Sequence, residues 1–108
     1  DSSKAADAAE TFQTAMADGD LATLRSITCG ERQEFYASVS DEEFAKAYQS
    51  QKARNEMMSF NEITGVEVQG DTARVGVEVY NTANPGETSP AQVTLHKIDG
   101  EWKVCTQP

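Results

Sequence analysis

Apolar side chains recur at every third or fourth position in the first half of the chain and at every second position in the second half. The first spacing is typical of amphipathic helices, and the alternation is typical of strands with one buried face. The period changes shortly after Asn55. The pattern therefore predicts an α+β fold, with N-terminal helices followed by a four-stranded antiparallel sheet.

The first two predicted helices are separated by Gly19. The first covers 4–17, and Ser2 or Ser3 can cap its N-terminus. Its apolar stripe consists of Ala5, Ala8, Ala9, Phe12, Ala15 and Met16. Gly19 can end this helix, and Asp20 can then cap a second, shorter helix. The second helix carries the apolar residues Leu21, Leu24 and Ile27.

Two further helices are predicted before the period changes. One covers about 31–39 and has Phe35, Tyr36 and Val39 on one side. The other covers about 41–52 and is preceded by Ser40, which forms a capping box with Glu43. In this motif the serine hydroxyl and the glutamate carboxylate each accept a hydrogen bond from the other residue's backbone amide. The aligned residues of this helix are Phe44, Ala47, Tyr48 and Gln51.

Two valine-rich strands are predicted on either side of a tight turn at Gly70-Asp71. The residues that alternate with polar ones are Val66, Val68, Ala73, Val75, Val77 and Val79. Closing the hairpin on two residues places Glu67 opposite Arg74, which is a favourable cross-strand pair. The upstream apolar residues are out of phase with this set, so a bulge is expected near Thr64-Gly65. These upstream residues are Met58, Phe60 and Ile63.

A second hairpin is predicted near the C-terminus. The segment from Asn81 to Ser89 is a predicted loop, in which Asn84-Pro85-Gly86 can form a type II turn. Strands over about 91–98 and 101–106 follow, joined by the strong hairpin signal Asp99-Gly100. This register predicts that one face carries Val93, Leu95, Lys97, Trp102 and Val104. The other face carries Thr94, His96, Ile98, Lys103 and Cys105.

The chain is acidic, with a net charge of −9 from 18 acidic and 9 basic residues. Such a protein repels nucleic-acid phosphates and anionic membrane surfaces, so we expect neither as a partner. The acidity can simply keep the protein in solution, or it can attract a basic partner. The length of 108 residues is that of one domain, which we place at 1–108.

The sequence contains no run of 18 or more apolar residues, so no segment of it is expected to span a bilayer. It opens with Asp1 and no methionine. We expect that the parent protein meets a membrane only through an anchoring segment absent from this chain, such as a leader, a lipid anchor or a membrane helix.

The two cysteines, Cys29 and Cys105, are separated by most of the chain. Exported proteins usually pair such cysteines, whereas cytosolic proteins usually keep them reduced. We predict a disulfide and an extracytoplasmic location, and the alternative is two separate buried thiols. A bridge that closes so long a loop stabilises a fold by roughly 4 kcal/mol in the chain-entropy model. Neither cysteine belongs to a CxxC motif, so thiol redox catalysis is not expected.

The order of these elements resembles the NTF2-like (cystatin-like) α+β cone. The resemblance depends on the closing segment 93–105, with Trp102 after its hairpin, and on the helix of Phe12 that breaks at 17–21. The chain is similar to lumazine-binding-like or DUF4878-type domains, which actinobacterial membrane proteins and lipoproteins often display outside the cytoplasm. The resemblance implies helices packed on a curved four-stranded sheet, and it brings Cys29 and Cys105 together where these layers meet. It also implies that the sheet can serve as a homodimer face.

Aromatic and thioether side chains are the candidates for a binding pocket. The cone of the NTF2-like fold can open into a small apolar pocket, although side chains of this kind usually form the core. The residues that we expect to line such a pocket are Tyr36, Tyr48, Met57, Met58, Phe60, Tyr80 and Trp102. Phe35 and Phe44 belong to the same aromatic set.

Catalytic signatures are weak in this sequence. His96 is the single histidine and has no zinc-ligand spacing around it, so we expect no metal and no cofactor. Related isomerases of the ketosteroid type use a buried carboxylate with tyrosine-type donors, and Glu62 and Glu78 are the acids to check for burial. We predict a noncatalytic domain that binds a protein partner or a small apolar ligand. The alternative is a ketosteroid-isomerase-like enzyme.

Overall fold

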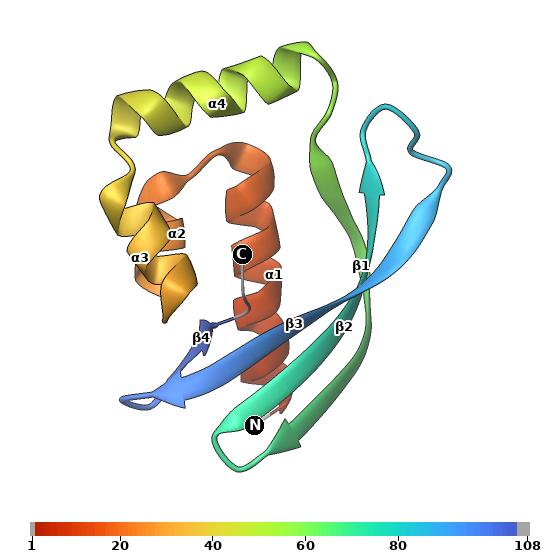
Figure 1. The fold of residues 1–108 in the computed structure, drawn as a ribbon. Helices are drawn as coiled ribbons and strands as arrows, with labels where there is room; N and C mark the ends of the chain where they lie inside the picture. Colours follow the sequence, from red (N-terminus) through yellow and green to blue (C-terminus); the bar gives the residue numbers. More distant parts are fainter. Residues whose placement is uncertain (1, 106–108) are drawn as a thin grey trace.

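The computed structural model describes residues 2–105 and places four helices against a four-stranded antiparallel sheet (Figure 1). The helices are α1 (Ser2–Asp18), α2 (Leu21–Ile27), α3 (Glu31–Ser38) and α4 (Asp41–Ala53). The strands are β1 (Met58–Gln69), β2 (Thr72–Asn81), β3 (Thr88–Ile98) and β4 (Glu101–Val104), and they neighbour one another in chain order. The predicted α+β fold is confirmed.

Short polar motifs define the ends of the helices. Helix α1 starts at Ser2, two residues before the predicted start, so Ser2 and Ser3 lie within the helix. Gly19 ends α1 as predicted, with a φ of +69° that side chains other than glycine rarely adopt. The carboxylate of Asp20 accepts a hydrogen bond from the Thr23 N–H at 3.2 Å, which confirms the predicted N-cap of α2.

The hydrophobic core lies where α1 crosses the inner face of the sheet (Figure 1). The alanine-rich stripe of α1 is buried, and its small side chains allow the helix to approach the strands closely. On the sheet, the buried side chains are Ala73, Val75, Val77, Val79, Val93, Leu95, Trp102 and Val104. Burying each valine or leucine contributes about 1.5–3 kcal/mol. The predicted division of the sheet into an apolar and a polar face is therefore correct.

Strand β1 pairs with β2 in the predicted register. Glu67 stands opposite Arg74, and their side chains form an ion pair of 3.4 Å. The register shifts at Thr64, where a bulge was predicted, and also at Asn61, where none was predicted. The two bulges bring Phe60, Ile63 and Val66 into line with buried residues of β2, so one strand keeps its apolar side chains on the inner face.

The connections around β3 differ in part from the prediction. The backbone N–H of Glu87 donates to the Asn84 carbonyl at 3.0 Å, which closes the predicted turn. Gly86 does not adopt the positive φ that a type II turn requires, so the predicted turn type is wrong. Strand β3 begins at Thr88, three residues before its predicted start. Asp99 and Gly100 both have positive φ, as the tight hairpin between β3 and β4 requires.

Cys29 and Cys105 form a disulfide, with their Cα atoms 4.8 Å apart. Thr28 pairs with Val104 in a parallel bridge, and the Cys29 N–H donates to the Val104 carbonyl at 2.9 Å. The predicted pairing is confirmed, and it joins the end of α2 to the end of the sheet. Strand β4 ends at Val104, one residue before Cys105, and the predicted end at position 106 lies outside the described residues.

Helix α4 stands away from the sheet and crosses one end of the molecule (Figure 1). None of its side chains is fully buried. Its capping box is present, because Ser40 Oγ accepts from the Glu43 N–H at 3.1 Å and the Glu43 carboxylate accepts from the Ser40 N–H. Arg25 links it to the helices below, with an ion pair to Asp41 of 3.0 Å. This helix therefore spans the open end of the cone.

Candidate functional site

A cavity of about 310 Å³ is lined by side chains of α4 and of the segments next to it. Helix α4 lies at the end of the molecule opposite the turn between β1 and β2 (Figure 1). The last turn of α1, the C-terminal half of α3, the inner side of α4 and the start of β1 enclose the cavity. Its lining residues are Met16, Phe35, Tyr36, Val39, Glu43, Phe44, Ala47, Tyr48, Gln51, Glu56, Met57 and Met58. The lining is mostly apolar, as is usual in sites that bind small molecules.

Tyr36 forms the floor of the cavity. Its side chain is buried, and its hydroxyl donates to the Met16 sulfur at 3.1 Å and accepts from Arg32 Nη1 at 3.2 Å. The ring packs edge to face against Phe35 and Phe44, with centroid distances of 5.3 and 6.4 Å. These contacts hold three rings from α3 and α4 in one cluster.

Tyr48 holds α4 to the end of α1. Its hydroxyl donates to the Ala17 carbonyl at 3.1 Å, which satisfies one of the free carbonyls at this helix C-terminus. The ring lies directly on Gly19, where a Cβ atom would come within 2.8 Å of the ring carbons. The close approach of α4 to α1 therefore depends on a glycine at this position.

The mouth of the cavity exposes apolar side chains to solvent. Phe35 is 54% exposed, Met58 is 52% exposed and Met16 is 36% exposed. Each of them contributes to the cavity lining, so the exposed apolar surface and the cavity are continuous. Exposed apolar side chains are common singly, but a group of them beside a concave surface is unusual, and it makes this cavity the candidate site.

The predicted pocket residues separate into two groups. Tyr36, Tyr48, Met57 and Met58 lie together around the cavity. The other three are Phe60, which is half-buried on the inner face of β1, Tyr80, on the outer face of β2, and Trp102, buried in the core. The alternation of Tyr80 with Val77 and Val79 already indicates the outer face.

Met16 and Val39 line the cavity and were not expected to do so. Met16 ends the predicted apolar stripe of α1, and Val39 follows the last turn of α3. The spacing of both residues predicted that they belong to the hydrophobic core. Because α4 does not pack closely over them, they border the cavity instead.

The acids proposed for an enzyme site do not reach the cavity. Glu62 pairs with Glu78 across β1 and β2, on the face of the sheet that points away from the helices. His96 is on the same outer face, opposite Thr72 of β2. In residues 2–105 no group of three or more His, Cys, Asp or Glu side chains is arranged to hold a metal ion. Within the same residues no helix is both long and apolar enough to cross a membrane.

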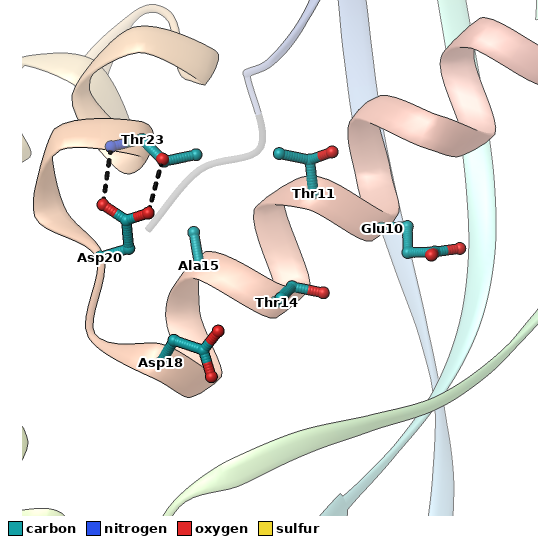
Figure 2. Close-up of a pocket in the computed structure, with 7 residues that line it drawn as sticks. All are labelled: Glu10, Thr11, Thr14, Ala15, Asp18, Asp20 and Thr23. Atoms are coloured by element: carbon teal, nitrogen blue, oxygen red, sulfur yellow. Dashed lines mark hydrogen bonds between the residues drawn. The ribbon is translucent and has the colours of Figure 1, made fainter.

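A second, more polar hollow lies along α1 and the start of α2 (Figure 2). It contains the acids Glu10, Asp18 and Asp20, and Figure 2 shows that Glu10 points away from the other two. The Thr23 hydroxyl donates to Asp20 at 2.7 Å, and this bond, with that from the Thr23 N–H, lowers the pKa of the Asp20 carboxyl. Asp20 is therefore engaged in helix capping, and the hollow has no convergent binding groups.

Solved structures with the same fold support this description. A proposed dehydratase of the NTF2-like family from Streptomyces avermitilis is 22% identical, with a TM-score of 0.59 over 96% of this chain and 90% of that one. A proposed polyketide cyclase from Sinorhizobium meliloti is 17% identical, with a TM-score of 0.53 over 94% of both chains. An NTF2-like protein of unknown function from Shewanella oneidensis MR-1 is 15% identical, with a TM-score of 0.54 over 92% and 89%. The fold is therefore NTF2-like.

A family model described as a domain of unknown function, DUF4878, matches residues 2–105. The chain belongs to this family, as the resemblance in its sequence predicted. No curated protein matches the chain significantly.

Proposed function

We propose that this chain is a noncatalytic binding domain that takes up a small apolar ligand beneath α4. The observation that carries the proposal is the continuity between the cavity and the exposed side chains of Phe35, Met58 and Met16. A ligand that covers these side chains removes apolar area from water. This burial stabilises the complex by about 25 cal/mol for each Å² of apolar area. The loose packing of α4 supports the proposal, because a helix without buried side chains can move to admit a ligand.

The enzyme alternative has less support. A ketosteroid-isomerase-like site needs a carboxylate inside the pocket, and Glu62 and Glu78 are on the outer face of the sheet. The two tyrosines at the cavity already donate their hydroxyl hydrogens, to Met16 and to Ala17. The names of the dehydratase and cyclase neighbours describe those proteins, and this fold carries many unrelated functions.

We also propose that the domain acts outside the cytoplasm, displayed by an anchored parent protein. The disulfide between Cys29 and Cys105 supports this location, because such bridges persist in oxidising compartments. The display by an anchored parent protein is what the resemblance described in the sequence analysis implies. Fractionation of cells that produce the full-length parent protein, with protease added to intact cells, tests the location. A domain that stays protected in the cytosolic fraction would contradict it.

Ligand binding can be tested with Nile red, a neutral dye whose fluorescence rises in apolar surroundings. We expect saturable binding to the native protein and about tenfold weaker binding to Phe35→Ser and Met58→Ser, because each substitution removes apolar contact worth 1.5–3 kcal/mol when fully buried. Both side chains are more than half exposed, so the fold should survive the change.

Ile98→Ser is the matched control, since Ile98 is 40% exposed and lies on the outer face of β3. It should bind the dye as the native protein does. Equal loss of binding in all three variants would show that the dye adheres to scattered apolar side chains, and the cavity proposal would fail.

A further inference from the structure

The charged residues that line the cavity are both acids. Glu43 is in the first turn of α4, and Glu56 follows the last turn. A 13-residue helix is about 20 Å long, so the two carboxylates stand at opposite ends of the opening. The twelve lining residues include no lysine, arginine or histidine. An anionic ligand would therefore find no cationic partner among the lining residues and would enter against the charge of Glu43, since Glu56 is paired with Arg54.

The basic side chains that contact lining residues of the cavity each have a partner already. Arg32 donates to the Tyr36 hydroxyl at 3.2 Å. Arg25 donates to the Tyr36 and Val39 carbonyls and forms an ion pair with Asp41.

Arg54 bonds one carboxylate oxygen of Glu56 at 3.2 Å and the Ser50 hydroxyl at 2.9 Å. Lys52 lies 5.8 Å from the centre of the Tyr48 ring and lines a neighbouring hollow. Within residues 2–105 Glu43 forms no ion pair, and its carboxylate accepts only from Ser40. Of the two lining carboxylates, Glu43 is therefore the one whose charge no basic side chain of the described residues pairs.

The inner surface of the cavity also favours a positive charge. Tyr36 with Phe35 and Phe44 forms an edge-to-face cluster of three rings that line the cavity. The faces of aromatic rings are electron-rich and attract cations by about 0.5–2 kcal/mol. Met16 lies in the last turn of α1, where the helix dipole is negative. The net charge of −9 adds a long-range attraction for cations.

We propose that the ligand is an apolar molecule that carries a positive charge, such as an alkyl or aryl amine or a quaternary ammonium compound. This inference rests on the proposed function of the cavity. The hydrocarbon part contacts the rings and the three methionine side chains, and the cationic group lies at the rim near Glu43 or Glu56. Two exposed carboxylates alone do not define such a site, and the aromatic lining supplies the second element.

The test compares three eight-carbon probes by isothermal titration calorimetry at low ionic strength. The probes are octyltrimethylammonium, octan-1-ol and octanoate, which differ in the charge of the head group. We expect octyltrimethylammonium to bind at least tenfold more tightly than octanol, and octanoate to bind most weakly. The preference should shrink in 0.5 M salt, because ions screen exposed charges.

The double variant Glu43→Gln/Glu56→Gln should lose about tenfold in affinity for the cation and keep its affinity for octanol. Glutamine also serves in a capping box, so α4 should remain folded. The matched control is Glu62→Gln/Glu78→Gln, which changes the net charge equally on the outer face. Unfolding midpoints of both variants show that each is folded.

The outcomes separate this inference from the proposed function. If the three probes bind equally, or octanol binds best, the cavity binds apolar ligands but the preference for cations is wrong. If both double variants lose the cation equally, the attraction comes from overall charge, and the assignment to the cavity rim is wrong. If no probe binds and Nile red does not bind either, the proposed function itself fails.

Discussion

At the scale of single residues, Gly19 has two roles that coincide. Its positive φ ends α1, and the absence of a side chain lets the Tyr48 ring lie against its backbone. The first role is readable from the sequence, since glycine is the usual residue after a helix. The second depends on a residue 29 positions away in the chain and follows from the docking of α4.

Gly19→Ala is therefore expected to destabilise the fold by about 2–4 kcal/mol. The left-handed backbone costs an alanine roughly 1–2 kcal/mol, and the added Cβ displaces the Tyr48 ring. Gly30→Ala is the matched control, because Gly30 has the same φ of +69° with no atom within 4 Å of the added Cβ. Urea unfolding followed by the fluorescence of Trp102 measures both. Equal losses would show that the contact with Tyr48 contributes nothing.

At the scale of elements, α4 differs from the other helices. The alanine stripe of α1 is buried against the sheet, and α2 buries Leu21 and Leu24. Helix α4 is attached through Tyr48, Phe44, its capping box and the ion pair between Arg25 and Asp41. Arg25 also donates to the Tyr36 and Val39 carbonyls, at 2.9 and 2.7 Å, so one side chain joins three helices. A few side-chain contacts with α1, α2 and α3, and not a buried apolar face, thus hold α4 in place.

Ser40→Ala removes one half of the capping box and should cost α4 about 1 kcal/mol. Because α4 has no buried side chain, we expect this loss to appear as local opening. Hydrogen exchange of amides in residues 41–53 should become about fivefold faster, with little change in the exchange of β2 and β3. Ser38→Ala is the control, since that hydroxyl only bonds the Phe35 carbonyl in α3. Uniformly faster exchange in all elements would contradict the independent opening of α4.

At the scale of the whole molecule, the disulfide closes the fold. It joins the segment after α2 to the end of the sheet, beside the bridge between Thr28 and Val104. Lys103 adds a hydrogen bond to the Ser26 carbonyl at the same junction. The helical half and the C-terminal strand are therefore held together by covalent and backbone links at the edge of the core.

Reduction of the bridge should lower the thermal midpoint by at least about 8 °C. A disulfide that closes a loop of this length adds roughly 2–4 kcal/mol to the free energy of unfolding. In a domain of this size, 1 kcal/mol corresponds to a change of about 4–8 °C in the unfolding midpoint. Calorimetry with and without reductant measures the shift, and a thiol assay of the native protein should find no free cysteine. Cys29→Ala/Cys105→Ala should be insensitive to reductant. A midpoint that reductant leaves unchanged would mean that the bridge adds no stability.

Local signals in the sequence were enough to predict most of the fold. Helix caps such as Asp20 and Ser40, the Asp99-Gly100 turn and the alternation of valines all act between residues that are neighbours in the chain. Such interactions form in the same way whatever the rest of the fold. The bulge at Asn61 and the backbone of Gly86 have no such signal, because strand pairing and the course of a loop decide them.

The candidate site is different, because no local rule determines it. The sequence by itself determined that Tyr36 and Tyr48 would lie on the apolar faces of their helices, and that Met57 and Met58 would lie where the helices give way to the sheet. Only the tertiary structure decided that these side chains would not pack against one another but would surround a cavity. Helix α4 begins and ends by its own caps but lies across the end of the cone, too far from the sheet to bury its side chains. The cavity and its acidic rim are consequences of that placement, which depends on long-range packing.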